Sequence, residues 1–210
     1  LRHPRVPALQ PGQHRELEIA WAPYVAHGVE RGGRPTKVGR RVTLQGVRHE
    51  IYSGRIVTLV TLDDHWEVVE HADAVAVLVA KGRSVLGVWQ HRPAVGHETW
   101  EIPAGLLEEG EEPVAAAARE LAEEAQLAGD LTLVTSLYAS PGFTDERVYL
   151  FELSEPRDDH GHAPDPGEDL RLEWRDALTV WRALASGAEV TSGVTALALR
   201  HLLARLGETV

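Results

Sequence analysis

The sequence contains no cysteine and no apolar run that approaches the length of a membrane span. The absence of cysteine excludes disulfide bonds, thiolate zinc sites and a cysteine nucleophile. A transmembrane helix needs about 20 consecutive apolar residues. The first residues, LRHPRVPALQPG, also lack the apolar centre of a secretory signal peptide. We therefore expect a soluble, cytoplasmic protein.

Basic residues are also few relative to acidic ones, with 21 Lys and Arg against 32 Asp and Glu and a net charge of −11. This excess of negative charge argues against broad binding to nucleic acid or to an anionic membrane, because both are negatively charged themselves. A ligand that carries phosphates would need a metal ion or a local arginine cluster to offset the acid. Neither a P-loop nor a GxGxxG fingerprint is present, so the sequence supports neither a kinase nor a dehydrogenase.

The composition divides the 210 residues into three segments: an extension, a strand-rich segment and the main domain. Residues 1–46 are rich in Arg, His, Gly and Pro, and we expect a partly mobile extension there. Residues 47–70 are rich in Val, Ile, Thr and aromatic residues between turn residues, which is typical of strands. Residues 71–210 are expected to form the main domain.

Strand and helix patterns alternate within residues 71–210. Further strands are expected in ADAVAVLVA, SVLGVWQHRP, LTLVTSLYAS, RVYLFEL and LRLEWRDA, and helices in ALTVWRALASG and VTSGVTALALRHLLARL. Another helix is expected from Pro113, because proline suits the first helical position. The alanines at 115–118 favour that helix, and Gly129 fits its end. The order predicts a mixed α/β fold.

The helix that begins at Pro113 carries an unusual density of charge in RELAEEAQL. Residues three or four apart share one helix face, so Glu120, Glu123 and Glu124 cluster there, and Arg119 lies one turn from Glu123. An isolated pair of glutamates on a helix is usually a solvated, salt-bridged face. The alternative is a metal site, because hard divalent ions bind carboxylate oxygens together with substrate phosphates.

The spacing around the cluster favours the metal site. Gly105, five residues, Glu111, seven residues and then the REL-x-EE run of residues 119–124 match the box of the Nudix hydrolases. The chain is therefore identified as resembling that family. It departs from the box at Gln126, where the family has a glycine typical of a helix end with positive φ. No predicted metal ligand is lost by that departure.

The resemblance implies a mixed β-sheet core sandwiched between helices and cleavage of a nucleoside diphosphate linked to another group. It implies metal binding, by Mg²⁺ or else Mn²⁺, through Glu120, Glu123, Glu124 and the backbone carbonyl of Ala104. Arg119 would orient these carboxylates. Glu111 would support the loop before the helix, through Arg119, and Gly105 would let the chain turn sharply beside the substrate.

Segments outside the box resemble the ADP-ribose pyrophosphatase subfamily, among them EVVEHADAVAVL, WQHRPAVG, EIPAG and SPGFTDERVYL. The resemblance assigns Glu146 as the base that activates the attacking water, acting with Glu123 and Arg119. It assigns Arg92 to the substrate, with an edge-strand surface arginine as the alternative. Trp66 stands where related enzymes often have arginine, and it could stack on adenine or pack in a dimer contact.

Other aromatic and histidine residues are given structural roles. Trp89, Trp100, Trp174 and Trp181 lie in strand or helix patterns, and we expect them in the core. The HGH run at His160–His162 lies in an acidic stretch and is expected to be a solvated loop rather than a metal site.

By resemblance, the expected activity is hydrolysis of ADP-ribose to AMP and ribose 5-phosphate. Alternative substrates are NADH, diadenosine polyphosphates or a GDP-sugar, and a non-catalytic ADP-ribose-binding module is a different class. The presence of every acid of the box favours catalysis. The subfamily also implies a homodimer in which the strands of residues 47–70 could serve as the dimerisation arm.

Overall fold

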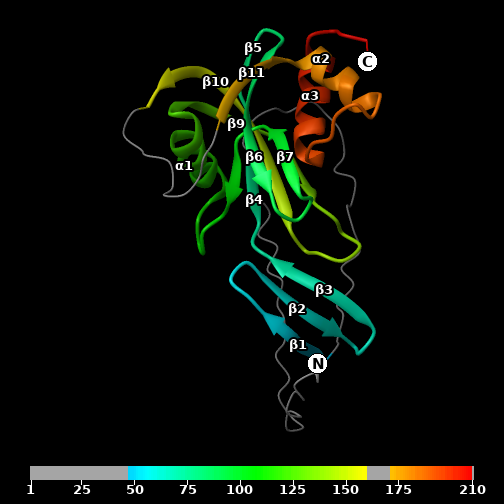
Figure 1. Ribbon diagram of the computed structural model, residues 1–210. Coiled ribbons are helices and arrows are strands. Elements are labelled where there is room, and N and C mark those ends of the chain that lie inside the picture. The colour runs from blue at the N-terminus through cyan, green and yellow to red at the C-terminus, as the bar shows by residue number, and fades with distance from the viewer. Residues whose placement is uncertain (1–46, 160–170, 210) are drawn as a thin grey trace, which may run out of the picture.

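The computed structural model describes residues 47–159 and 171–209 (Figure 1). The predictions for residues 1–46 and for the HGH run lie outside the described residues. The strands are β1 (Arg48–Ser53), β2 (Val57–Leu62), β3 (Trp66–His71), β4 (Ala74–Leu78), β5 (Ala80–Lys81), β6 (Ser84–Arg92), β7 (His97–Glu101), β8 (Ala104–Leu106), β9 (Leu127–Tyr138), β10 (Arg147–Asp158) and β11 (Arg171–Asp176). The helices are α1 (Pro113–Ala125), α2 (Ala177–Ala185) and α3 (Gly193–Arg205). None of the described helices is long and apolar enough to cross a membrane.

The strands form three sheets. One sheet has the order β8-β4-β10-β9, in which β4 and β10 are parallel and the other pairs antiparallel. A second has the order β11-β6-β5, with β7 also paired to β6. The third, β1-β2-β3, extends away from α1, α2 and α3 (Figure 1). We call this antiparallel sheet the arm.

Strand β4 lies at the centre of the molecule and is buried on both faces. Ala74, Ala76 and Leu78 pack into a core with α2 and α3, whereas Val75 and Val77 pack into a second core with α1. A strand covered on both faces reads as a continuous apolar run rather than an alternating one, which explains the sequence AVAVL. The structure confirms the predicted mixed sheet between helices.

Helix α1 begins as predicted at Pro113 but ends at Ala125, so the expected end at Gly129 is wrong. Gln126 caps the helix in the left-handed conformation, with φ 55° and ψ 39°, and its N–H donates to the carbonyl of Ala122 at 3.1 Å. Gln126 thus takes the backbone geometry that the family glycine suits. Strand β9 then starts at Leu127, because pairing with β10 extends to Asp158.

The structure confirms the predicted core position for three of the four tryptophans and contradicts it for the fourth. Trp100 is fully buried, and Trp89 and Trp181 pack against the core from partly buried positions. The prediction for Trp174 is wrong, because its side chain is exposed. It lies on β11, at the edge of its sheet, where the ammonium of Lys81 stands 4.8 Å from the ring centroid. A cation over the ring stabilises an aromatic side chain that the core does not cover.

The left-handed Gln126 predicts that Gln126→Gly stabilises the protein. A left-handed conformation costs a residue with a Cβ about 1–2 kcal/mol, and the extra chain entropy of glycine in the unfolded state offsets about 0.4–1 kcal/mol. We expect the free energy of unfolding in urea to rise by about 0.5–1 kcal/mol. Gln126→Ala, the matched control, should give no gain because it retains the strain. A destabilised glycine variant would contradict this account.

Candidate active site

The guanidinium of Arg119 organises the loop before α1 and the acidic face of the helix. Its Nε and Nη2 donate to Glu111 at 3.1 and 3.0 Å, and Nη2 also donates to the carbonyl of Leu106 at 2.9 Å. Its Nη1 donates to Glu120 at 2.7 Å and to Glu123 at 3.2 Å. The hydrogen bonds to Glu111 do most to raise the pKa of Arg119, and those same bonds lower the pKa of Glu111. The predicted contacts of Arg119 are therefore present.

Gly105 has a different role from the predicted sharp turn. It lies in β8, paired with Val75, and a Cβ at this position would stand 2.0 Å from Cδ of Glu120. A larger residue would displace the Glu120 carboxylate from its place against the strand. The prediction of a turn is wrong, because the position requires close approach rather than an unusual backbone angle.

Glu124 anchors the cluster to the same strand. It is buried, and its carboxylate accepts a hydrogen bond from the N–H of Ala104 at 3.0 Å. Burial of a carboxylate is costly unless hydrogen bonds or charges compensate it. The helix and β8 therefore share the groups that the sequence predicts as metal ligands.

The chemistry of these groups fits a hard divalent cation. The carboxylates of Glu111, Glu120 and Glu123 accept hydrogen bonds from Arg119, and the carboxylate of Glu124 accepts one from the N–H of Ala104 on β8. Oxygen donors with excess negative charge are what Mg²⁺ and Mn²⁺ bind. Among the described residues no three acidic or histidine side chains already converge as a metal cage. A cation here would compete with Arg119 for Glu120 and Glu123.

Glu146 lies on a separate segment, in the loop between β9 and β10. Its carboxylate stands 4.0 Å from Nδ1 of His71, at the end of β3, and its carbonyl accepts from the N–H of Ala139 at 3.0 Å. Its side chain is largely covered but reaches solvent. The loop thus places a carboxylate where β3 meets β4.

Sheet pairing brings this loop towards the α1 cluster. Val75 of β4 pairs with Gly105 on one side and with Tyr149 on the other. Neighbouring strands lie about 4.8 Å apart, so β8 and β10 are separated by about 10 Å. Gly105, which receives Glu120, and Glu146, which precedes β10, therefore belong to the same end of the sheet.

Arg92 is held by a partner that the sequence does not reveal. Its Nε and Nη2 each donate to a different carboxylate oxygen of Glu101, both at 3.1 Å, and Thr99 also donates to Glu101, at 2.5 Å. Glu101 is buried, whereas the Arg92 side chain is 41% exposed. A single glutamate in a strand gives no spacing signal, which is why sequence reasoning does not identify Glu101.

Trp66 lies far from these groups within one chain. It begins β3, whereas His71, which contacts the Glu146 loop, ends it. Five residues of extended strand span about 17 Å. The indole is 56% exposed and contacts only the ring of His65 edge-on among the described aromatic rings, at 4.9 Å between centroids. The structure does not bring Trp66 together with the other predicted site residues.

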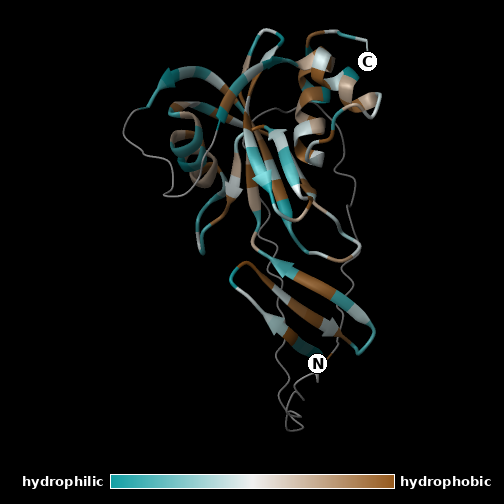
Figure 2. Ribbon diagram, viewed as in Figure 1, coloured by the Kyte–Doolittle hydropathy of each residue, from teal (hydrophilic) through white to brown (hydrophobic). Residues whose placement is uncertain are grey.

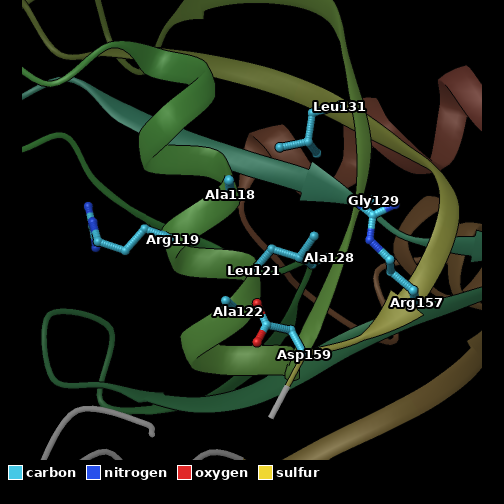
Figure 3. A pocket seen from close by; sticks show the side chains of 9 residues that line it. All are labelled: Ala118, Arg119, Leu121, Ala122, Ala128, Gly129, Leu131, Arg157 and Asp159. Atoms are coloured by element: carbon cyan, nitrogen blue, oxygen red, sulfur yellow. The ribbon is translucent and has the colours of Figure 1, made fainter. Parts of the chain in front are cut away.

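A hollow of about 400 Å³ lies beside α1 but is not formed by the glutamates of the cluster (Figure 3). In Figure 3 the side chain of Arg119 points away from Arg157 and Asp159, which lie across from the helix. The hollow is lined by Ala118, Arg119, Leu121, Ala122, Ala128, Gly129, Leu131, Arg157 and Asp159. The carboxylate chemistry therefore identifies the candidate active site better than the shape of this hollow does.

Comparisons with known proteins agree with the geometry. A family model described as NUDIX domain matches residues 70–193. An ADP-ribose pyrophosphatase of Bacillus subtilis (strain 168) is 37% identical over 169 residues, covering 74% of this chain and 89% of that protein. An ADP-ribose pyrophosphatase of Mycobacterium tuberculosis is 38% identical over 135 residues, covering 60% of this chain and 63% of that protein.

A solved structure described as an ADP compounds hydrolase shares the fold with a TM-score of 0.62 and 17% identity, covering 78% of this chain and 97% of that one. The family model and the relatives identify the chain as a hydrolase, and its fold gathers the acids of α1 against β8 and the loop before the helix. The chain belongs to the NUDIX family. Enzymes of this family generally use divalent metal cations.

The environment of Glu101 predicts a pH-dependent contribution to stability. Burial raises the pKa of Glu101. The hydrogen bonds from Arg92 and Thr99 and the charge of Arg92 lower the pKa by more than burial raises it, so the pKa falls below its ordinary value of 4.5. The folded state then binds fewer protons than the unfolded state, and the stabilisation is present above about pH 4.5 and lost on acidification through the folded pKa.

We expect Glu101→Gln to lower the free energy of unfolding at pH 7 by about 1–3 kcal/mol. The difference in free energy of unfolding between wild type and variant should shrink as the pH falls below about 4.5. Protonation of Glu101 in the wild type then removes the charge that the variant lacks. Urea unfolding at a series of pH values measures this gap. A gap that stays constant into acid would refute the charge-based explanation.

Proposed function

We propose that this Nudix hydrolase cleaves the diphosphate of ADP-ribose to AMP and ribose 5-phosphate, with Mg²⁺ or Mn²⁺ as its cation. The observation that carries the proposal is the cluster of Glu120, Glu123 and Glu124, held by Arg119 and fitted against Gly105. The negative oxygens of a diphosphate and the carboxylates of this cluster repel one another, so a cation must lie between them. Both relatives described above are named ADP-ribose pyrophosphatases, which supports the choice of substrate.

Glu120, Glu123, Glu124 and the carbonyl of Ala104 would hold the cation. When bound, it offsets the charge of the diphosphate and of the transferring phosphoryl group. Arg119 keeps Glu120 and Glu123 oriented on one side of α1. Gly105 keeps the strand close enough for the substrate and the Glu120 carboxylate to share the site.

Glu146 serves as the general base. Its carboxylate takes a proton from the attacking water as the new P–O bond forms, and the bridging P–O bond breaks to release AMP and ribose 5-phosphate. Positioned bases of this kind contribute about 10²- to 10⁴-fold to rate.

Arg92 and Trp66 are proposed to act on the substrate outside the diphosphate. The fork of hydrogen bonds to Glu101 fixes the Arg92 guanidinium in one plane, which suits paired hydrogen bonds to phosphate or to the nucleoside end. Trp66 cannot reach the site of its own chain from the far end of β3. It would stack on adenine only in the site of a second copy.

The catalytic assignment predicts distinct losses in two variants. Glu146→Gln should lower kcat for ADP-ribose about 10²-fold or more with little change in KM, because the base is lost and the binding groups remain. Glu120→Gln should lower kcat and weaken the response to Mg²⁺. Chromatographic quantification of AMP measures both, and Asp130→Asn, an exposed acid on β9, is the control.

A substrate panel tests the proposal directly. The purified protein is incubated with Mg²⁺ and ADP-ribose, NADH, diadenosine polyphosphates, CoA or GDP-mannose. Fastest AMP release from ADP-ribose supports the proposed substrate. Turnover of another compound alone would refute ADP-ribose as the substrate and leave the assignment as a Nudix hydrolase unchanged. Tight ADP-ribose binding without product would show a binding module, and near-normal rates in Glu120→Gln would refute the metal assignment.

We also propose that the arm makes this protein a homodimer. The middle of β3 is hydrophobic and its ends are hydrophilic (Figure 2), and the sheet projects from the rest of the molecule (Figure 1). Exposed large apolar side chains gather on and beside the arm, at Val47, Ile51, Tyr52, Ile56 and Trp66. Apolar surface gathered on a projecting sheet is typical of an interaction site, and in such a dimer the Trp66 of one copy would stack on the adenine bound by the other.

Light scattering of the full chain tests the dimer. We expect twice the chain mass at micromolar concentration, and a shift towards monomer in Ile56→Asp, because burial of a charge opposes association. Val190→Asp changes an apolar residue of similar exposure outside the arm and should leave the mass unchanged. A wild-type monomer would overturn the proposal.

A further inference from the structure

The loop that carries Glu146 continues the parallel pairing of β4 with β10 beyond the end of the sheet. Val148 pairs with Ala74 at the start of that ladder. Further out, Val69 of β3 forms a parallel bridge with Thr144, and its N–H donates to the carbonyl of Phe143 at 2.7 Å. The loop between β9 and β10 therefore runs alongside the end of β3 (Figure 1).

Two carboxylates join β3 to the loop in the stretch between the Val69–Thr144 bridge and the Val148–Ala74 pair. Asp145 of the loop accepts a hydrogen bond from the N–H of His71 at 2.9 Å. Asp73, which follows β3, accepts one from the N–H of Arg147 at 3.1 Å. Each segment thus supplies a side-chain acceptor to a backbone donor of the other, and the two bonds lie on either side of Glu146 in the chain.

Asp73 also connects this loop to the segment before α1. Its carbonyl accepts from the N–H of Leu107 at 2.8 Å, one residue beyond β8, and its second carboxylate oxygen accepts from the hydroxyl of Tyr149 at 3.5 Å. Leu106 in turn accepts from Arg119. A short chain of hydrogen bonds therefore joins the Glu146 loop to the residues that orient the glutamates of α1.

We propose that Asp73 and Asp145 are positioning residues that fix Glu146 relative to the carboxylates of α1. This inference rests on the proposed role of Glu146 as the base. The bond from His71 to Asp145 is exposed to water, so it contributes little net free energy to the fold. Its effect is on geometry, since a displacement of about 1 Å at a reacting group can cost about 10²-fold in rate.

Asp145 gives the sharper test, because its hydrogen bond requires an acceptor oxygen but no charge. Asp145→Ala removes the acceptor, whereas Asp145→Asn keeps a carbonyl oxygen in the same place. We expect Asp145→Ala to lower kcat for ADP-ribose about 10- to 100-fold, with KM changed less than about twofold and an unchanged melting temperature. Asp145→Asn should restore most of the rate, and Asp130→Ala is the control.

Hydrogen exchange of the His71 amide gives a readout that does not depend on activity. Measured by NMR in the full chain, this amide should exchange faster in Asp145→Ala than in wild type, Asp145→Asn or Asp130→Ala, because only the alanine variant loses its acceptor.

The two readouts separate the possible failures. If Asp145→Asn were as slow as Asp145→Ala, the charge of Asp145 would matter and the positioning role would be overturned. A normal kcat in Asp145→Ala, or unchanged exchange of the His71 amide, would also overturn it. A wild-type protein that does not cleave ADP-ribose would refute the proposed substrate, while the exchange of His71 would still decide whether Asp145 holds the loop.

Discussion

The hydrogen bonds of the Arg119 guanidinium are the interaction on which the site depends. One planar, permanently charged group satisfies two oxygens of Glu111, one each of Glu120 and Glu123, and the carbonyl of Leu106. A lysine could not do this, because its ammonium lacks the fixed fork of donors. The bonds hold the loop before α1 against the helix and allow several carboxylates to face one another. Without that cation, their mutual repulsion would oppose the observed geometry.

The central strand β4 determines what surrounds this cluster. Because it is buried on both faces, it carries α1 on one side and α2 and α3 on the other. Because it pairs with β8 and β10, it also sets the distance between Gly105 and the Glu146 loop. Strand β8, which lies against the acids of α1, and strand β10, which follows the proposed base, are distant in sequence but only two strand spacings apart. The arm enters this arrangement where β3 passes into β4.

Several features were accessible to sequence reasoning and others were not. The preference of proline for the first helical position located the start of α1 at Pro113. The box spacing from Gly105 to Glu124 carried the family resemblance, and that resemblance implied the contact between Glu111 and Arg119. The same reasoning misplaced the helix end, since Gln126 adopts a left-handed conformation usual for glycine. It also placed Trp174 in the core, because a strand pattern does not distinguish an edge strand from a central one. For Gly105 it identified the residue and missed the reason.

The sequence by itself determined the family, through the spacing of the box, and the clustering of the α1 carboxylates, because helical spacing places those side chains on one face wherever the helix lies. Only the tertiary structure decided the partners. Arg92 meets Glu101 across a pair of antiparallel strands, and the Glu120 carboxylate occupies the space beside Gly105 because β8 lies against α1. Asp145 accepts from the N–H of His71 and Asp73 from the N–H of Arg147. Such contacts join residues whose separation in the chain follows no fixed period, so they exist only once the strands have paired and the two cores have formed.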